Sequence, residues 1–318
     1  MNDRFLFPLS FKLGLASLAL VGAGEANAGM FTDTIEEFGK ARAEGKSTFA
    51  LDIDNDSLLF NKNDGFYTSG IRLVRQYALR DAERLTVYGW RFGQEIYTPS
   101  DIKLQPEQIS PNDHPYAGWL YGGLFRSVHR ADGTHTRIGF DLGCIGPCSG
   151  AKGTQTALHR VIDQPLPQGW SRQVRNEPGV VLYADIAPVR WTPVVSLDVT
   201  PTVHGRFGNI FTDAGLGVTA RAGRLNALPD QPAAYGFARI DGRVVAYDAT
   251  LQGGYFSSGN PHTVQPKRWV GEAEIGVAWT GTTYGVKASV LRRSNEIRDL
   301  PDAAGAQNFV RLQFSYAP

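Results

Sequence analysis

Polar side chains that could activate water gather in two stretches of the sequence. In LDIDNDSLLF and GFYTSGIRL, Asn55, Asp56 and Thr68 place amide, carboxylate and hydroxyl oxygens near the ends of two strand-like segments. In TQTALHRVID, Gln155 and His159 lie about one helical turn apart. Histidine is the side chain most readily poised as a general base near neutral pH, and hard cations such as calcium take oxygen ligands. Together these residues could hydrolyse an ester whose carbonyl is polarised by a metal ion.

Each group also has a simpler interpretation. Asn55 and Asp56 are consecutive, so a regular strand would point them to opposite faces. Both can serve one site only if the strand ends, bulges or contributes a backbone carbonyl there. An acidic strand end exposed to water would need no metal, and His159 could be a loop histidine that only packs against the rest of the fold. Spacing alone therefore leaves the chemistry open.

The stretch that carries the histidine reads as a short helix with two different faces. An apolar face is formed by residues at helical spacing: Ala157, Leu158, Val161 and Ile162. Gln155, His159 and Asp163 follow one another at intervals of four residues. We therefore expect these three side chains to lie close together on a different face of the helix.

Other catalytic patterns have no support in the sequence. The remaining histidines show no HxxxH or HExxH spacing for zinc, no GxSxG nucleophile elbow occurs, and the glycine-rich stretches lack phosphate-loop spacing. Ser149, in PCSGAKG, is expected to be an exposed loop serine, and the sequence places no base beside it. The net charge of +1 gives no reason to expect a nucleic-acid partner.

The N-terminus predicts an exported protein. Arg4 and Lys12 precede the apolar run LGLASLALVGA, which is followed by the small-residue pattern Ala26-Asn27-Ala28. We interpret residues 1–28 as a signal peptide and residues 29–318 as one domain. Export also permits a disulfide between the only two cysteines, Cys144 and Cys148 in CIGPC, and we predict that bond.

The elements that must position these residues are predicted to be strands. Apolar and polar residues alternate almost to the end of the chain, as in Ile138, Phe140 and Leu142, or Val195, Leu197 and Val199. Short and long connections also alternate, which is typical of an outer-membrane barrel, although a soluble β-sandwich shows the same residue period. Aromatic residues near strand ends, such as Trp119, fit interfacial girdles. The predicted strands, about twelve in number, are 48–56, 67–79, 83–97, 116–129, 134–144, 178–189, 192–204, 213–224, 234–250, 269–280, 282–294 and 307–316.

The ordered motifs resemble one family, the outer-membrane lipid A 3'-O-deacylases of the LpxR type. The stretches that carry the resemblance are DIDNDSLLF, GFYTSGIRL, GQEIYTPSDI, DHPYAGWLYGG, DLGCIGPCSG, QTALHRVID and PQGWSRQVRNEPG. The resemblance implies an all-β antiparallel barrel of about twelve strands in the outer membrane of a Gram-negative bacterium, with a short helical segment in a long extracellular loop. It also implies that lipid A, the anchor of lipopolysaccharide, is the substrate and that outer-membrane lipids surround the barrel.

The resemblance further implies a calcium-dependent esterase that removes the 3'-linked acyloxyacyl chain. In that mechanism, which parallels phospholipase A2, a histidine activates water and Ca²⁺ forms the oxyanion site. The catalytic residues carried over are His159, Asn55, Asp56, Thr68 and Gln155, with Asn55 and Asp56 as the metal ligands. The active site is then expected at the outer leaflet.

Three positions depart from the family pattern. His114 stands where many relatives have arginine, in DHPYAGW. Lys103 lies only near the position of a basic site residue, and Pro165 falls where an acidic residue is expected. Two other functions remain open on the sequence: a barrel phospholipase with a serine nucleophile, and a non-catalytic pore or structural barrel.

Overall fold

The computed structural model describes residues 28–56 and 65–318, with the side chains of residues 28–35 left out. The chain divides into two compact units between Glu44 and Gly45. The described part of the first unit is the helix α2 (Ala28–Glu44), to which the sequence analysis assigned no element. The predicted signal peptide lies outside the described residues, except for its last residue.

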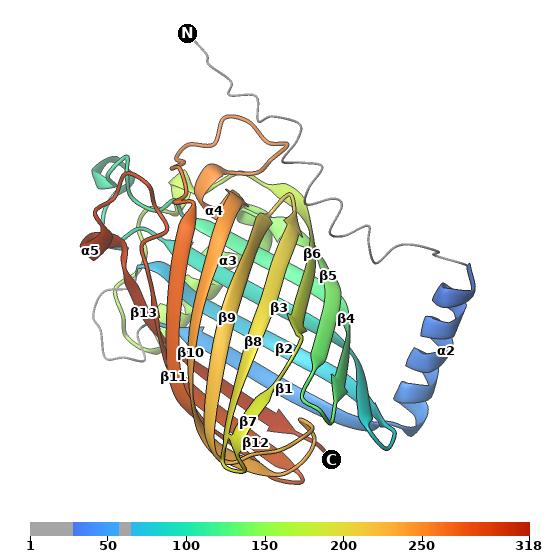
Figure 1. Ribbon diagram of the computed structural model, residues 1–318. Coiled ribbons are helices and arrows are strands. Elements are labelled where there is room, and N and C mark those ends of the chain that lie inside the picture. The colour runs from blue at the N-terminus through green and yellow to red at the C-terminus, as the bar shows by residue number, and fades with distance from the viewer. Residues whose placement is uncertain (1–27, 57–64) are drawn as a thin grey trace, which may run out of the picture. The chain divides into compact units, whose positions relative to one another are not determined.

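The second unit is a closed antiparallel barrel (Figure 1). Consecutive strands pair with each other, except that β6 pairs with β8 and not with β7. The pairing of β1 with β13 and that of β6 with β8 close the circle. In the described residues twelve strands are long and β7 is a short addition, so the predicted fold is confirmed. The strands are β1 (Lys46–Asn55), β2 (Phe66–Arg80), β3 (Arg84–Thr98), β4 (Ala117–Arg130), β5 (His135–Ile145), β6 (Glu177–Ala187), β7 (Trp191–Val194), β8 (Leu197–Gly208), β9 (Phe211–Arg224), β10 (Ala233–Asp248), β11 (Trp269–Thr280), β12 (Tyr284–Arg293) and β13 (Gln307–Tyr316).

The strand predicted over 192–204 is wrong at its start. The structure places a turn at residues 195–196, between β7 and β8, and Val195 is exposed there. The apolar residues Val195, Leu197 and Val199 continue the strand period through this point, so the pattern hides the turn. The β7 strand pairs with the start of β8, at Leu197 and Val199. The later part of β8, residues 203–208, pairs with β6.

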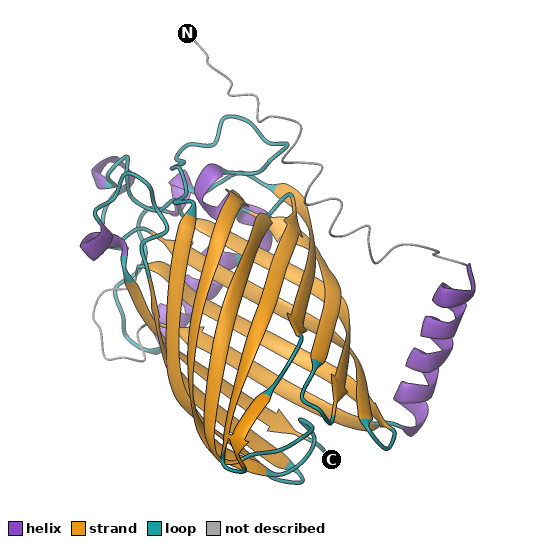
Figure 2. Cartoon of the chain, in the orientation of Figure 1, coloured by secondary structure: helices purple, strands orange, loops and turns teal. Residues whose placement is uncertain are grey.

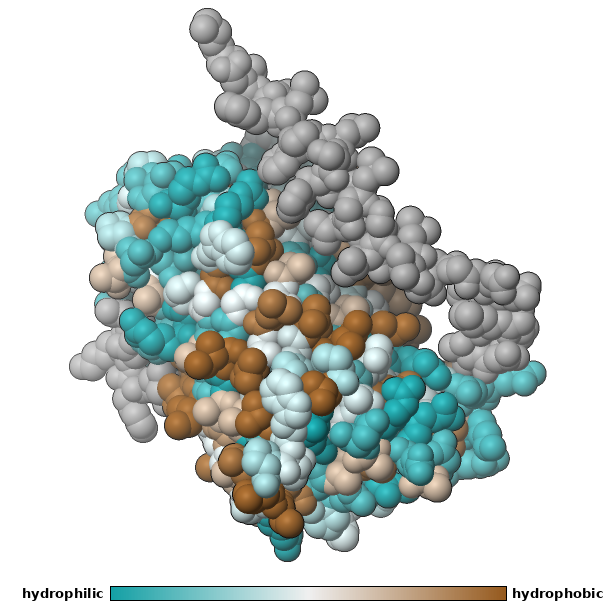
Figure 3. Space-filling model, in the orientation of Figure 1, coloured by the Kyte–Doolittle hydropathy of each residue, from teal (hydrophilic) through white to brown (hydrophobic). Residues whose placement is uncertain are grey.

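The alternation along each strand separates the outer wall from the lumen. On β5, the side chains of Ile138 and Leu142 are exposed on the outer wall, whereas Arg137 and Asp141 line the lumen side. Apolar residues accordingly gather over the strands in the space-filling view, and hydrophilic residues cover the loop end (Figure 3). This is the polar-inside, apolar-outside pattern of a barrel whose outer wall meets lipid.

Some of the aromatic side chains lie inside the lumen, which corrects part of the girdle prediction. Trp119, Tyr121 and Phe309 are buried in a cluster inside the barrel, because they occupy inward positions of their strands. Ion pairs lie beside this cluster: Arg311 binds the Asp54 carboxylate with two hydrogen bonds of 2.8 and 3.1 Å. Side chains therefore pack inside the part of the lumen that contains Asp54, Phe309 and Arg311.

Long loops lie at one rim and short turns at the other (Figure 2). The loops hold the 3₁₀ helices η2 (Pro106–Gln108), η3 (Pro147–Ser149) and η4 (Trp170–Arg172), and the α-helices α3 (Ala151–Val161), α4 (Ala249–Gln252) and α5 (Asp302–Gly305). The predicted loop helix is thus confirmed as α3. Among the described helices, none has the length and apolar character needed to span a bilayer.

Candidate active site

Helix α3 is held against the outer wall of the barrel at strands β3 and β4. A glycine makes the close approach possible: a Cβ at Gly118 on β4 would come within 2.2 Å of Ser149 Oγ and 2.3 Å of Ala151 Cβ. Ser149 is therefore buried rather than exposed as expected, and its hydroxyl donates to the Gly146 carbonyl at 2.6 Å. Gly150 begins the helix with a φ of 70°, a left-handed conformation that glycine adopts without strain.

The predicted disulfide is present just before this helix. Cys144, at the end of β5, is bonded to Cys148 in η3, with 6.0 Å between their Cα atoms. The bond closes a short loop, so that the start of α3 is tied to the strand that precedes it. The base of the helix is therefore fixed covalently as well as by packing.

The polar face of α3, and not its apolar face, is turned toward the barrel. Gln155 and His159 are 2% and 5% exposed, whereas Val161 is 82% exposed. Asp163 does not join them, which corrects the prediction of three side chains on one face. The helix ends at Val161, and Asp163 follows in a left-handed conformation with a φ of 52° and an exposed side chain.

A backbone carbonyl orients the histidine ring. The chain reverses after α3, with Gln164 N–H donating to the His159 carbonyl, and this returns the Pro165 carbonyl oxygen to within 2.7 Å of His159 Nδ1. Because a carbonyl can only accept, Nδ1 must carry the proton and the neutral ring then has its lone pair on Nε2. Pro165 thus supplies the orienting oxygen, at the position where the resemblance led us to expect an acidic side chain.

The amide of Gln155 is oriented in a similar way. Its Oε1 accepts a hydrogen bond of 2.9 Å from the indole N–H of Trp170 in η4. The other end of the amide, Nε2, is buried and has no hydrogen-bond partner among the described residues. An amide N–H₂ buried without an acceptor is costly, so a group that accepts from it would be stabilised there.

The end of β1 explains how the consecutive residues Asn55 and Asp56 escape the alternation of a regular strand. Asp52 and Asp54 belong to the lumen series, where Gln313 and Arg311 bind them, whereas Asn55 faces the outer wall. The strand ends at Asn55, so Asp56 is free of the strand alternation. The Asp56 carboxylate is buried and accepts the backbone N–H of Gly65 at 2.9 Å.

A β-bulge on β2 positions the threonine. Tyr67 pairs with Tyr97 and Ser69 pairs with Ile96, so Thr68 is an extra residue in the ladder. A bulge interrupts the strict alternation, and here it lets both Thr68 and Ser69 face the same side. The Thr68 hydroxyl is fixed by a 2.7 Å hydrogen bond to the hydroxyl of Thr98.

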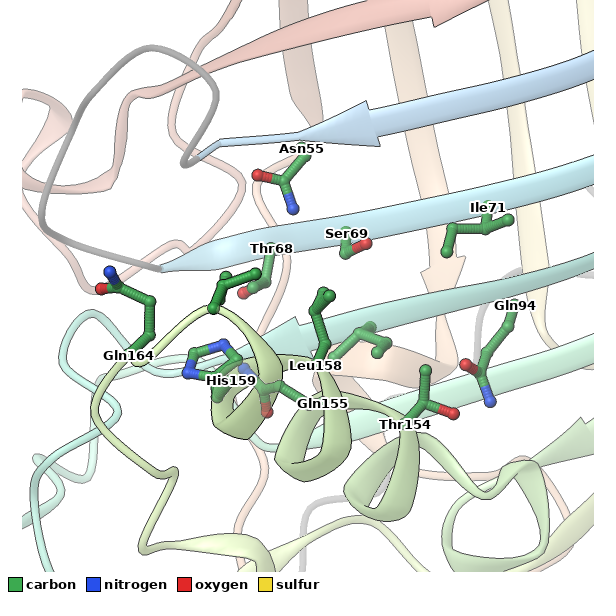
Figure 4. Close-up of a pocket in the computed structure, with 12 residues that line it drawn as sticks. Asn55, Thr68, Ser69, Ile71, Gln94, Thr154, Gln155, Leu158, His159 and Gln164 are labelled. Carbon is green, nitrogen blue, oxygen red and sulfur yellow. The ribbon is translucent and has the colours of Figure 1, made fainter.

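Four of the five predicted catalytic residues meet in one small pocket between α3 and the strands (Figure 4). They are Asn55, Thr68, Gln155 and His159, whereas the fifth, Asp56, does not line the pocket. The cavity holds about 30 Å³, which is room for a water molecule or two. The other lining residues are Ser69, Ile71, Gln94, Ile96, Thr154, Leu158, Ile162 and Gln164.

The oxygens around this pocket are of the kind that calcium takes. Asn55 and Thr68 line the pocket, and Asp56 directly follows Asn55 in the chain. Calcium accepts amide, hydroxyl, carboxylate and backbone oxygens. Within residues 28–56 and 65–318, no three His, Cys, Asp or Glu side chains cluster to hold a metal ion. A cation here would therefore rest on one carboxylate and on neutral oxygens.

The other two positions that depart from the family pattern, His114 and Lys103, do not line the pocket. His114 is buried, stacks on the ring of Tyr97 at 5.6 Å, and its Nδ1 lies 2.6 Å from the Pro115 carbonyl oxygen. Burial lowers the pKa of the His114 imidazole. Lys103 is exposed in the loop between β3 and β4.

Sequence reasoning missed several contributors to the pocket. Thr98, Pro165 and Trp170 each hold a predicted residue in place, and Ser69 shares its lining. Trp170 lies within PQGWSRQVRNEPG, which was used for the resemblance, so that motif was the available signal. Pro165 acts through its backbone, and no residue type predicts such a contact.

Comparisons with known proteins give the family and a solved structure with the same fold. Residues 15–317 match the family described as outer membrane protein LpxR. The solved structure of LpxR from Salmonella typhimurium has the same fold, with a TM-score of 0.72 and 21% identity over 85% of this chain and 100% of that one. The β-domain of the Bordetella autotransporter BrkA aligns with a TM-score of 0.47 and 10% identity over 86% of this chain and 98% of that one. No match was found among curated proteins. Because the family match covers nearly the whole chain, this protein is a member of the LpxR family and a barrel of the outer membrane.

Proposed function

We propose that the protein is a calcium-dependent lipid A 3'-O-deacylase that hydrolyses the ester of the 3'-linked acyloxyacyl chain. The observation that carries the proposal is the orientation of His159, whose Nδ1 is held by the Pro165 carbonyl at 2.7 Å in a pocket on the outer wall. A ring fixed in this way presents its Nε2 lone pair to a water molecule. A pocket on the outer wall of an outer-membrane barrel would be accessible from the lipid layer, in which lipid A resides.

The hydrolysis would proceed with water as the nucleophile. His159 Nε2 takes one proton from the water molecule while the water oxygen forms a bond to the ester carbonyl carbon. The carbonyl oxygen then becomes an oxyanion. The imidazolium then gives its proton to the departing sugar oxygen as the C–O bond breaks. The products are the free acyloxyacyl acid and a 3'-hydroxyl on the sugar, so atoms and charge balance.

The remaining residues would stabilise and position this reaction. Gln155 Nε2, buried and without an acceptor, would donate to the oxyanion. Asn55 and Asp56 would hold calcium together with an oxygen of Thr68, and the bound cation would supply Lewis-acid polarisation of the carbonyl. Thr98 keeps the Thr68 hydroxyl in its orientation.

Mass spectrometry of lipid A tests the proposal. We expect cells that express the protein to lose the 3'-linked chain, and cells that express His159→Ala to retain it. Purified protein incubated with lipopolysaccharide in detergent should release the same acid only when calcium is present. Unchanged lipid A in both experiments would refute the deacylase function.

A serine esterase is the second candidate, because Ser69 lines the same pocket as His159. In that mechanism the Ser69 hydroxyl attacks the ester, an acyl-enzyme forms, and lysophospholipid is the product if a phospholipid is the substrate. Ser69→Ala distinguishes the two routes: it abolishes activity through a serine nucleophile and spares activity through activated water. The aromatic cluster inside the barrel gives no support to the third function, a pore.

A further inference from the structure

The exposed side of helix α3 carries apolar residues that no part of the described chain covers. Val161, Ile162 and Leu158 are 82%, 46% and 39% exposed. In a loop surrounded by water, a helix of this kind would turn these residues toward the protein and its polar residues outward. Here the polar residues Gln155 and His159 face the protein instead. Such an inverted arrangement suits a helix whose exposed side meets an apolar medium.

The apolar flank of α3 continues the outer wall of the barrel. Leu158 lines the pocket together with Ile71, which is itself partly exposed and precedes Leu73 in the outward series of β2. Val161 follows Leu158 by three residues and therefore lies on the same flank of the helix. The helix and the strand thus both present apolar residues on the outer side of the barrel.

Basic residues lie on the other flank of the helix. At about 100° of rotation per residue, Lys152 and Arg160 fall well away from Leu158 and Val161, and both basic side chains are exposed. An interfacial helix has this division, with its apolar side among acyl chains and its lysines and arginines at the level of the anionic headgroups.

We propose that the flank formed by Leu158, Val161 and Ile162 is immersed among acyl chains of the outer leaflet, and that the substrate's acyl chain enters the pocket sideways between Leu158 and Ile71. The second part rests on the proposed deacylase function. A cavity of about 30 Å³ cannot enclose an acyl chain, so the chain must lie along this apolar surface while only the ester reaches His159.

Depth-dependent fluorescence quenching tests the immersion without any need for activity. Val161→Cys is labelled with an environment-sensitive fluorophore and placed in vesicles whose phospholipids carry bromine on the acyl chains; the native cysteines are bonded to each other and do not react. We expect strong quenching at this position and at Leu124→Cys on the barrel wall, but weak quenching at Arg160→Cys on the opposite flank. Quenching at Leu124→Cys without quenching at Val161→Cys would overturn the proposal.

Activity in bilayers tests the sideways entry. Val161→Lys places a charge on the apolar flank and should lower the rate on vesicle-embedded lipopolysaccharide by about tenfold or more, whereas Val161→Leu should stay close to wild type. Val161 is too exposed for either change to disturb the fold. An unchanged rate for Val161→Lys would refute the sideways entry. If the wild type itself releases no acid, the deacylase proposal fails, and the quenching experiment still decides the immersion.

Discussion

The indole N–H of Trp170 donates to Oε1 of Gln155 across 2.9 Å, and this contact determines which end of the amide faces the pocket. With Oε1 engaged, Nε2 is the group left to meet a substrate. Gln155 therefore acts as a hydrogen-bond donor in the proposed mechanism and not as a calcium ligand.

The first prediction follows from that orientation. Gln155→Glu keeps the oxygen that Trp170 binds but replaces the donor with a second acceptor. We expect kcat to fall by about 10²-fold, the usual effect of removing one oxyanion donor, with a smaller change in KM. Steady-state kinetics on detergent-solubilised lipopolysaccharide would measure both constants. A variant with wild-type kcat would show that the amide donates nothing to the transition state.

The second prediction concerns the general base. His159→Ala should lower turnover by about 10²-fold or more, because no other group would take the proton from water. The barrel should still form, since the residue lies on a loop helix outside the sheet. His135→Gln, at a lumen position distant from the pocket, is the matched control and should keep its activity.

The third prediction concerns calcium. Asp56→Asn retains an oxygen to accept the Gly65 N–H but removes the charge, so we expect weaker calcium binding and a large loss of activity that excess calcium partly restores. Titration calorimetry with calcium alone gives a readout that does not depend on turnover. Thr68→Ala should have a milder effect if the hydroxyl only orients a ligand or water. Full activity of chelator-treated wild-type protein would exclude the metal from the mechanism.

The fourth prediction concerns the disulfide. Alkylation of the denatured, non-reduced protein should label neither Cys144 nor Cys148, because they are bonded to each other. The double substitution of both residues by serine should leave the barrel folded, as judged by its migration in mild SDS without heating. We expect activity to fall, since the start of α3 would be less restrained. Unaltered kinetics would show that packing on Gly118 alone positions the helix.

The fifth prediction is an acid-sensitive loop around His114. Burial lowers the pKa of this imidazole in the folded protein, so the unfolded loop binds the proton more readily. The stabilising contribution is therefore fully present above the unfolded pKa of about 6.5 and is lost as the pH falls through the lower folded value. Proteolysis of the loop between β3 and β4, followed across this pH range, should accelerate on acidification. His114→Gln should remove the dependence.

Much of the architecture could be predicted from the sequence because it depends on local patterns. Alternation is a property of neighbouring residues, so a strand such as β5 could be recognised from Ile138, Phe140 and Leu142 without knowledge of its partners. The long and short connections followed from the same pattern, and the ordered motifs indicated the family. The pattern failed at Val195, because a turn between two apolar residues leaves the alternation unchanged.

Only the tertiary structure decided which polar residues work together. The sequence presents Asp52, Asp54, Asn55 and Asp56 as one acidic stretch, yet strand pairing assigns the first two to lumen partners and Asn55 to the outer pocket. The bulge at Thr68 depends on the register between β2 and β3, a relation between distant segments. The Pro165 carbonyl that orients His159 is a backbone group common to all residues. Such contacts form between segments that are distant in the sequence, so the type of a single residue could not predict them.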